Sequence, residues 1–286
     1  MKKGFLNTWD SLRRSKTGMI GLILVLVVIL CALFAPVLAP YDPLAQDLMN
    51  KLKDPIWAAR SSAGHILGTD QLGRDILSRL LYGSRVTLIV ALAGTIVGGI
   101  VGVVMGCLAG YYGKWVDAII MRLVDIQLCF PFTLLALFIA AVLGSSLGNV
   151  ILIAGITSWV RYARLVRGEI LSIKETEYVE AIRATGGSDA RIIFYHILPN
   201  IISPVIVIAT LEMAKIVLME ASLSFLGYGV PINIPTWGRM LSEARDNILT
   251  NPWQCIFPGL CITLTVLGVN LLGDWLRDYL DPKLDV

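Results

Sequence analysis

The stretch that decides the fold class is residues 19–39, MIGLILVLVVILCALFAPVLA, which contains no charged side chain. A helix of about 20 apolar residues crosses the roughly 30 Å of hydrocarbon in a bilayer. The rest of the chain is similar, because 56% of its 286 residues are hydrophobic and only 16% are charged. An ordinary soluble domain carries about 25% charged residues. The sequence therefore predicts an all-α polytopic membrane protein and excludes a disordered chain, a coiled coil and most soluble enzymes.

Six transmembrane helices can be drawn from the hydropathy of the chain. In chain order they cover residues 19–39, 86–110, 118–143, 149–171, 200–222 and 256–276. The fourth is the least apolar, because Arg161, Arg164 and Arg167 follow its apolar part. We expect this helix to run past the membrane surface, with its arginines reaching water. If it does not cross, the side assigned to every later loop reverses.

The distribution of basic residues predicts the orientation of the chain. Lys and Arg are more numerous on the side of the N-terminus, which places both termini in the cytoplasm by the positive-inside rule. The first apolar run is too long for a signal peptide, so we expect it to be retained. The predicted parts are a cytoplasmic tail (1–18), the first span (19–39), an extracytoplasmic loop (40–85), a transmembrane core (86–276) and a second cytoplasmic tail (277–286). The net charge of +3 is too small to indicate a nucleic-acid partner.

The second predicted span carries a glycine at every fourth position. These glycines are Gly94, Gly98, Gly102, Gly106 and Gly110. Small residues at this spacing form a ridge on which another helix can pack closely. The partner is either a helix of the same chain, which we favour, or a second subunit.

Residues 172–199 predict a helix-glycine-helix hairpin on the cytoplasmic side. Ser172 and Glu175 have capping-box spacing, a helix follows to about Thr185, and Gly186-Gly187 can end it. A second short helix would run from 188 and stop before Pro199. The hairpin has mixed charges and lacks the basic face of a helix that lies on lipid, so a soluble protein is the expected partner.

No catalytic or metal-binding constellation is predicted. A Walker A sequence is absent, so any ATPase would be another chain. The stretch 144–148 fits G-x-S-x-G but has no preceding strand and no nearby histidine. His65, Asp70 and Asp75 could be imagined as metal ligands, yet capping and solvated groups explain them more simply. The five cysteines have no metal or disulfide spacing.

Charged residues inside the predicted spans are the remaining candidates for a translocation path. These residues are Arg122, Asp125, Glu212, Lys215 and Glu220. The first four form two pairs at i,i+3 spacing, so each pair can neutralise itself, whereas Glu220 has no charged neighbour within its turn. A charge at the bilayer centre costs about 2.5–3.5 kcal/mol on insertion scales and requires a partner or a wet cavity. Structural ion pairs and groups facing a substrate path both remain open.

Four stretches resemble one known family. The sequence EAIRATG at 180–186, followed by ILP at 197–199, resembles the EAA motif of permease subunits of bacterial binding-protein-dependent ABC importers. Three further stretches resemble the "C" permeases of dipeptide, oligopeptide and nickel importers. They are LGTDQLGRD at 67–75, SLSFLG at 222–227 with Trp237-Gly238, and GDWLRDYLDP at 273–282. Ile182 and His196 depart from the general motif, which affects the fine fit to an ATPase.

The resemblance implies that the chain is half of a translocation pathway in the bacterial inner membrane and is not itself an enzyme. Its partners would be a homologous second permease, two cytoplasmic ATPase subunits and an extracytoplasmic solute-binding protein. ATP and Mg would be bound by the ATPases, with no cofactor in this chain. The hairpin residues expected to contact the ATPase are Glu177, Tyr178, Glu180, Ala181, Arg183, Gly186, Gly187 and Arg191.

The substrate is expected to be a di- or oligopeptide, with nickel or another chelated metal as the alternative. A membrane scaffold that recruits a cytosolic protein without transporting anything is an alternative of a different class. An intramembrane enzyme is a third possibility, but the spans hold no reactive set of side chains.

Overall fold

The computed structural model describes residues 9–58, 61 and 64–280. Its long helices are α2 (Lys16–Leu38), α3 (Ile76–Tyr112), α4 (Lys114–Leu128), α5 (Phe132–Leu143), α6 (Leu147–Ile173), α9 (Leu198–Phe225) and α11 (Trp253–Leu280). The shorter ones are η1 (Leu48–Asn50), α7 (Glu177–Ala184), α8 (Asp189–Arg191), η2 (Ile192–Ile197), α10 (Trp237–Ala244) and η3 (Arg245–Asn247). The described residues form no strand, so the all-α class is confirmed. The outer parts of both predicted tails, 1–8 and 281–286, lie outside the described residues.

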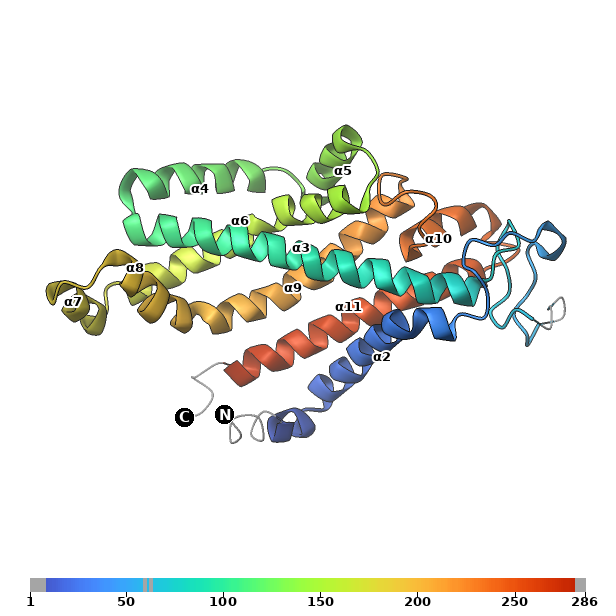
Figure 1. Ribbon diagram of the computed structural model, residues 1–286, viewed down its shortest axis with the longest axis horizontal. Coiled ribbons are helices and arrows are strands. Elements are labelled where there is room, and N and C mark those ends of the chain that lie inside the picture. Colours follow the sequence, from blue (N-terminus) through green and yellow to red (C-terminus); the bar gives the residue numbers. More distant parts are fainter. Residues whose placement is uncertain (1–8, 59–60, 62–63, 281–286) are drawn as a thin grey trace.

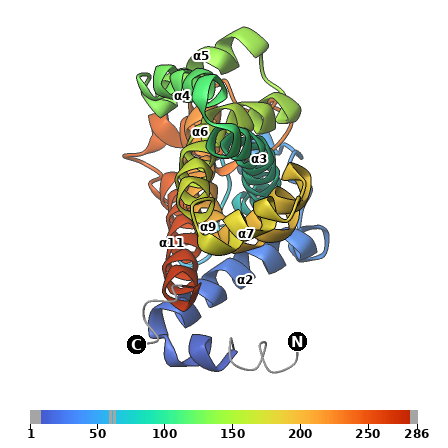
Figure 2. The same ribbon diagram turned by 90° about the vertical axis from the view of Figure 1, so that its left-hand side faces the viewer.

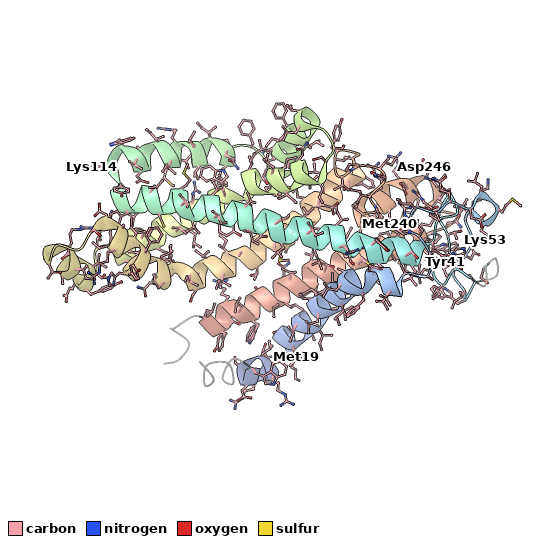
Figure 3. The ribbon with its side chains drawn as sticks, in the orientation of Figure 1. Met19, Tyr41, Lys53, Lys114, Met240 and Asp246 are labelled. Atoms are coloured by element: carbon pink, nitrogen blue, oxygen red, sulfur yellow. The ribbon has the colours of Figure 1, made fainter. Side chains whose placement is uncertain are left out.

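The long helices form an elongated bundle with two distinct ends (Figure 1). One end carries α7 and α8 and is called the hairpin end. The other carries α10 and the segment between α2 and α3, and is called the loop end. Figure 3 places Tyr41, Lys53 and Asp246 at the loop end and Lys114 toward the hairpin end. Figure 2, a view onto the hairpin end, shows α2 along one edge of the bundle and α4 and α5 along the opposite edge.

Four helical segments are long and apolar enough to cross a membrane. They are α2, α3, the continuous run Asp189–Phe225, and α11, which correspond to the predicted spans 19–39, 86–110, 200–222 and 256–276. The second begins earlier than predicted, at Ile76, because the Asp75 side chain accepts a hydrogen bond from the backbone N–H of Ser78 and caps the helix. The loop predicted at 40–85 is therefore shorter, and Arg79 belongs to a helix.

The third predicted span, 118–143, is not one straight helix. The chain bends by 91° between α4 and α5. Pro131 stands immediately before α5, where it has no N–H to continue the hydrogen bonds of α4 and restricts the residue before it. The pair forms either one broken span or a re-entrant segment.

The fourth predicted span, 149–171, corresponds to α6 but is not among the segments apolar enough to cross by composition. With 27 residues, α6 is about 40 Å long at 1.5 Å per residue. It runs parallel to α3 and packs along the glycine ridge. A Cβ atom added at Gly106 would lie 2.7 Å from the carbonyl oxygen of Ala163, and one at Gly110 would lie 2.9 Å from Cβ of Ile170.

All five ridge glycines approach α6, at residues 154, 158, 162, 166 and 170 or their neighbours. From one contact to the next, the contacting residue moves four positions along each helix. The two backbones therefore stay in close contact over the whole ridge. The prediction of packing within the chain is confirmed. The ridge is occupied by α6 and is not an open face for a second subunit.

Candidate functional site

The hairpin turns at Gly186, as predicted. This glycine has φ +83°, in the left-handed region that favours glycine, and a Cβ there would meet nothing within 4 Å. Gly187 is required for a different reason, since its Cβ would lie 2.6 Å from Cγ2 of Ile182. The residues predicted to contact an ATPase are exposed, apart from half-buried Gly187. They present one open surface at the hairpin end.

Two details of the hairpin differ from the prediction. Its first helix, α7, starts after Thr176, because Ser172 still belongs to α6 and no capping box forms. The second helix does not stop before Pro199 but continues through the π-helical turn η2 into α9. A wider π turn accommodates the missing N–H of a proline in a membrane helix. The hairpin is therefore joined to α9 without a loop.

The underside of the hairpin is packed against the bundle. Val179 and Ile192 are fully buried in a cluster with Val166 and Ile170 of α6. The Tyr111 hydroxyl lies 2.6 Å from Oδ1 of Asp189, and Nζ of Lys174 donates to the carbonyl oxygen of Gly110 over 3.0 Å. The hairpin thus contacts the ends of α3 and α6 and is continuous with α9.

At the loop end, the stretch 67–75 builds a compact turn ahead of α3. Gly68 and Gly73 have positive φ, and a Cβ at Gly73 would overlap the backbone of Asp47. Asp75 caps α3 and its Oδ1 lies 2.9 Å from Nδ1 of His65. Among the described residues, no group of three or more His, Cys, Asp or Glu is placed to hold a metal ion. The predicted capping role is confirmed for Asp75, but the expectation of solvated groups is wrong, because His65, Asp70 and Asp75 are all buried.

Four charged residues at this end form a closed cluster, called here the loop-end cluster. It consists of Asp70, Arg74, Arg79 and Glu243, whose side chains are 2–16% exposed. Arg79 contacts Asp70 Oδ2 at 2.5 Å and Glu243 Oε2 at 2.8 Å, while Arg74 contacts the same two oxygens at 2.6 and 2.7 Å. Two negative and two positive charges cancel within it. Hydropathy could not indicate that Arg79 is buried.

The arginines of α6 do not simply reach water. Arg164 donates to Asp125 over 2.7 Å, and Arg167 makes two hydrogen bonds to Asp117, both carboxylates belonging to α4. Asp125 therefore pairs across helices instead of with Arg122, which is exposed and has no ion pair among the described residues. The predicted Arg122–Asp125 pair is wrong, because the facing helix brings Arg164 closer to that carboxylate.

The predicted Glu212–Lys215 pair is confirmed but incomplete. Oε1 of Glu212 accepts from Nζ of Lys215 at 2.9 Å and also from Arg161 of α6 at 2.8 Å. These three residues are called the mid-helix cluster. The Glu212 side chain is 1% exposed, whereas those of Arg161 and Lys215 are 35% and 43% exposed. The missing partner, Arg161, could only have been found by knowing how α6 faces α9.

Glu220, one of the predicted path residues, is buried near the loop end of α9. Its Oε1 accepts a hydrogen bond from the Ser224 hydroxyl, one turn along the same helix, at 2.7 Å. The structure thus supplies a neutral hydrogen-bond partner where the sequence offered no charged one. Glu220 does not join the mid-helix cluster.

A cavity of about 260 Å³ lies at the break between α4 and α5. Its lining includes Phe130, Pro131, Thr157 and Arg161. Gln127 also lines it and links the two sides, because its side chain donates to the carbonyl oxygen of Ile156 at 2.7 Å. The mid-helix cluster therefore borders an open space through Arg161.

Comparison with known proteins places this architecture in a family. Residues 102–286 match the model of the binding-protein-dependent transport system inner membrane component, and residues 5–55 match the N-terminal TM domain of oligopeptide transport permease C. The chain is 44% identical to the dipeptide transport system permease protein DppC of Alkalihalophilus pseudofirmus, covering 96% of this chain and 89% of that one. It is 42% identical to the glutathione transport system permease protein GsiD of Pectobacterium atrosepticum, covering 96% and 90%.

A solved structure supports the fold. A chain of the MetNI methionine ABC transporter, in an inward-facing conformation, matches with a TM-score of 0.57 and 19% identity, covering 71% of this chain and 96% of that one. The helical bundle thus has the fold of an ABC transporter permease. The chain belongs to the family of inner membrane components of binding-protein-dependent transport systems.

Proposed function

We propose that this chain is the permease subunit of an importer for di- or oligopeptides and that residues 172–199 couple it to cytoplasmic ATPase subunits. The observation that carries the proposal is the hairpin itself. It exposes its charged residues, buries Val179 and Ile192 against α6 and continues into α9 without a loop. An element with these properties transmits the motion of a docked protein directly to the membrane helices.

The peptide substrate is inferred from the relatives, whose names include dipeptide and glutathione transport. The complete transporter would contain a homologous second permease, two ATPases that bind ATP and Mg, and an extracytoplasmic solute-binding protein. The proposed path is formed by polar groups between helices, with Glu212 and Lys215 as its central candidates and Arg122, Asp125 and Glu220 as further ones. Uptake of labelled dipeptides and nickel complexes by the same reconstituted transporter separates the peptide substrate from the metal alternative.

Coupling is tested by Gly186→Val in the complete transporter. A side chain at this left-handed position costs roughly 1 kcal/mol or more and reshapes the turn. We expect weaker ATPase docking and slower ATP-driven dipeptide uptake, with insertion into the membrane unchanged. Gly144→Val is the matched control, since Gly144 has φ +78° with nothing within 4 Å of its Cβ position but joins α5 to α6. Equal docking and uptake in the two variants would remove the hairpin from the mechanism.

Orientation is tested by reporter fusions. We propose six crossings with both termini in the cytoplasm, which puts the loop end outside and the hairpin inside. A reporter active only outside the cytoplasm should be active after Asp54 or Asp246 and silent after Gly187. Activity after Gly187 would mean that α6 does not cross.

A further inference from the structure

The charge balance of the mid-helix cluster differs from that of the other ion pairs of α6. Arg164 with Asp125 and Arg167 with Asp117 each combine one cation with one carboxylate. In the mid-helix cluster, Arg161 and Lys215 share the single carboxylate of Glu212. The cluster therefore carries a net charge of +1.

The geometry brings the two cations together on one carboxylate oxygen. Both nitrogen atoms contact the same oxygen, Glu212 Oε1, so they lie within two hydrogen-bond lengths of each other. Glu212 is buried beneath them, whereas the two cationic side chains are about one third and two fifths exposed. Each cation has further N–H donors that Glu212 does not use, because a guanidinium has five and an ammonium three.

The location makes an unbalanced charge expensive. Arg161 lies near the middle of α6, and Glu212 and Lys215 lie near the middle of α9. In the proposed orientation both helices cross the membrane, and a net charge within a crossing helix needs water or an anion nearby. The cavity at the α4–α5 break is lined by Arg161 but not by Lys215, so it supplies space for either on the Arg161 side of the cluster.

We propose that Arg161 and Lys215 form a subsite that binds the carboxylate of a peptide as it passes through the transporter, with Glu212 holding the two cations together. This inference rests on the proposed function. A peptide's C-terminal carboxylate brings the charge of the occupied site to zero. The carboxylate also accepts hydrogen bonds from both cations at once. Such charge-assisted hydrogen bonds are stronger than those between neutral groups.

The test uses the complete reconstituted transporter in nanodiscs and a dipeptide that carries a photoreactive benzophenone side chain. The probe is made with either a free or an amidated C-terminus. We expect the free acid to cross-link to this chain at least about tenfold more efficiently, the effect of one hydrogen bond to a charged group. Lys215→Met and Arg161→Gln should each bring the ratio toward one, and Lys215→Arg should retain it.

If Arg161→Gln lowers the melting temperature, the result from Lys215→Met decides the test. In Lys215→Met, Arg161 still pairs with Glu212. The control is Arg245→Gln, which removes an equally charged but fully peripheral side chain at the loop end and should keep the wild-type ratio. Equal cross-linking of the two probes in the wild type, no cross-link from either, or an unchanged ratio in Lys215→Met would overturn the subsite. ATP-driven dipeptide uptake by the wild type is measured in parallel. Absence of uptake would contradict the proposed function, whereas normal uptake with equal cross-linking of the two probes would contradict only the subsite.

Discussion

The two charged clusters of this protein contain the same kinds of side chain but differ in balance and in exposure. In the loop-end cluster, Asp70 and Glu243 match Arg74 and Arg79, and every side chain is largely buried. In the mid-helix cluster, two cations share Glu212 and remain partly exposed. A balanced and closed cluster has neither net charge nor access for a charged ligand, whereas an unbalanced and open one has both. Charge inside a membrane protein indicates a binding site only when its balance and its access are both known.

The largest expected effect is on the closed cluster. Asp70→Ala leaves Arg74 and Arg79 buried with Glu243 as their only carboxylate, and breaking a buried ion pair costs about 3–5 kcal/mol. It also removes the acceptor for the backbone N–H groups of Leu72 and Arg74. We expect a much lower melting temperature of the reconstituted complex. Asp246→Ala, at an exposed carboxylate of the same end, is the control, and equal melting temperatures would contradict a structural role for this cluster.

A smaller loss of stability is expected for Glu212→Gln, which removes the carboxylate between two cations that can turn toward solvent. We expect about 1.5–3 kcal/mol, the range for hydrogen bonds to charged groups. The net charge of the mid-helix cluster rises by one, but Glu212 no longer holds the two cations together, so cross-linking of the free-acid dipeptide should fall less than in Lys215→Met. Thermal melting and photo-cross-linking of the same preparation measure both effects. A fall in cross-linking as deep as that of Lys215→Met would show that the positive charge is not what attracts the peptide.

Lys215→Met should barely change stability. Its side chain is 43% exposed and Glu212 keeps Arg161, so the loss should be at most about 1 kcal/mol, as for exposed ion pairs. The melting temperature should stay near that of the Arg245→Gln control while the preference for the free acid falls. If Lys215→Met melted at a temperature as low as Asp70→Ala, both clusters would have a structural role, and the mid-helix cluster would not be a binding site.

The smallest effect on stability is expected from salt. At 1 M ionic strength the screening length is about 3 Å, compared with about 8 Å at 0.15 M, and buried pairs are screened much less than exposed ones. Raising the NaCl concentration over this range should reduce cross-linking of the free-acid dipeptide. The difference in melting temperature between the wild type and Asp70→Ala measures the contribution of the loop-end cluster. This difference should change little over the same range of NaCl concentration. If the cross-linking preference for the free-acid dipeptide did not change with NaCl concentration, the peptide carboxylate would not be bound by solvent-accessible charges.

Much of the fold follows from local patterns in the sequence. The charge-free run 19–39 predicts a span that the structure forms as α2, and the four-residue spacing of Gly94 to Gly110 predicts a close helix contact. Gly186 turns the hairpin because a left-handed residue there is a local requirement. The break at Pro131 was within reach of the same reasoning, since a proline removes a helix hydrogen bond wherever it stands. The prediction failed there because hydropathy alone treats 118–143 as one apolar segment.

The charged sites were only partly within reach of the sequence. Spacing of three residues correctly paired Glu212 with Lys215, because both partners lie on one turn of one helix. The same rule wrongly paired Arg122 with Asp125, whose carboxylate is taken by Arg164 of α6. Hydropathy placed Arg79 in the loop 40–85, although the structure buries it between the carboxylates of Asp70 and Glu243.

The sequence by itself determined which segments are apolar, where the hairpin turns and which residues carry charge, because these depend on neighbours within one or two helical turns. The tertiary structure decided that Arg161 joins Glu212 and that Arg79 meets Glu243. Contacts of 3 Å between helices depend on the rotation and register of each helix against the next. Those are fixed by the packing of the whole bundle, including the parallel contact of α3 with α6 along the glycine ridge.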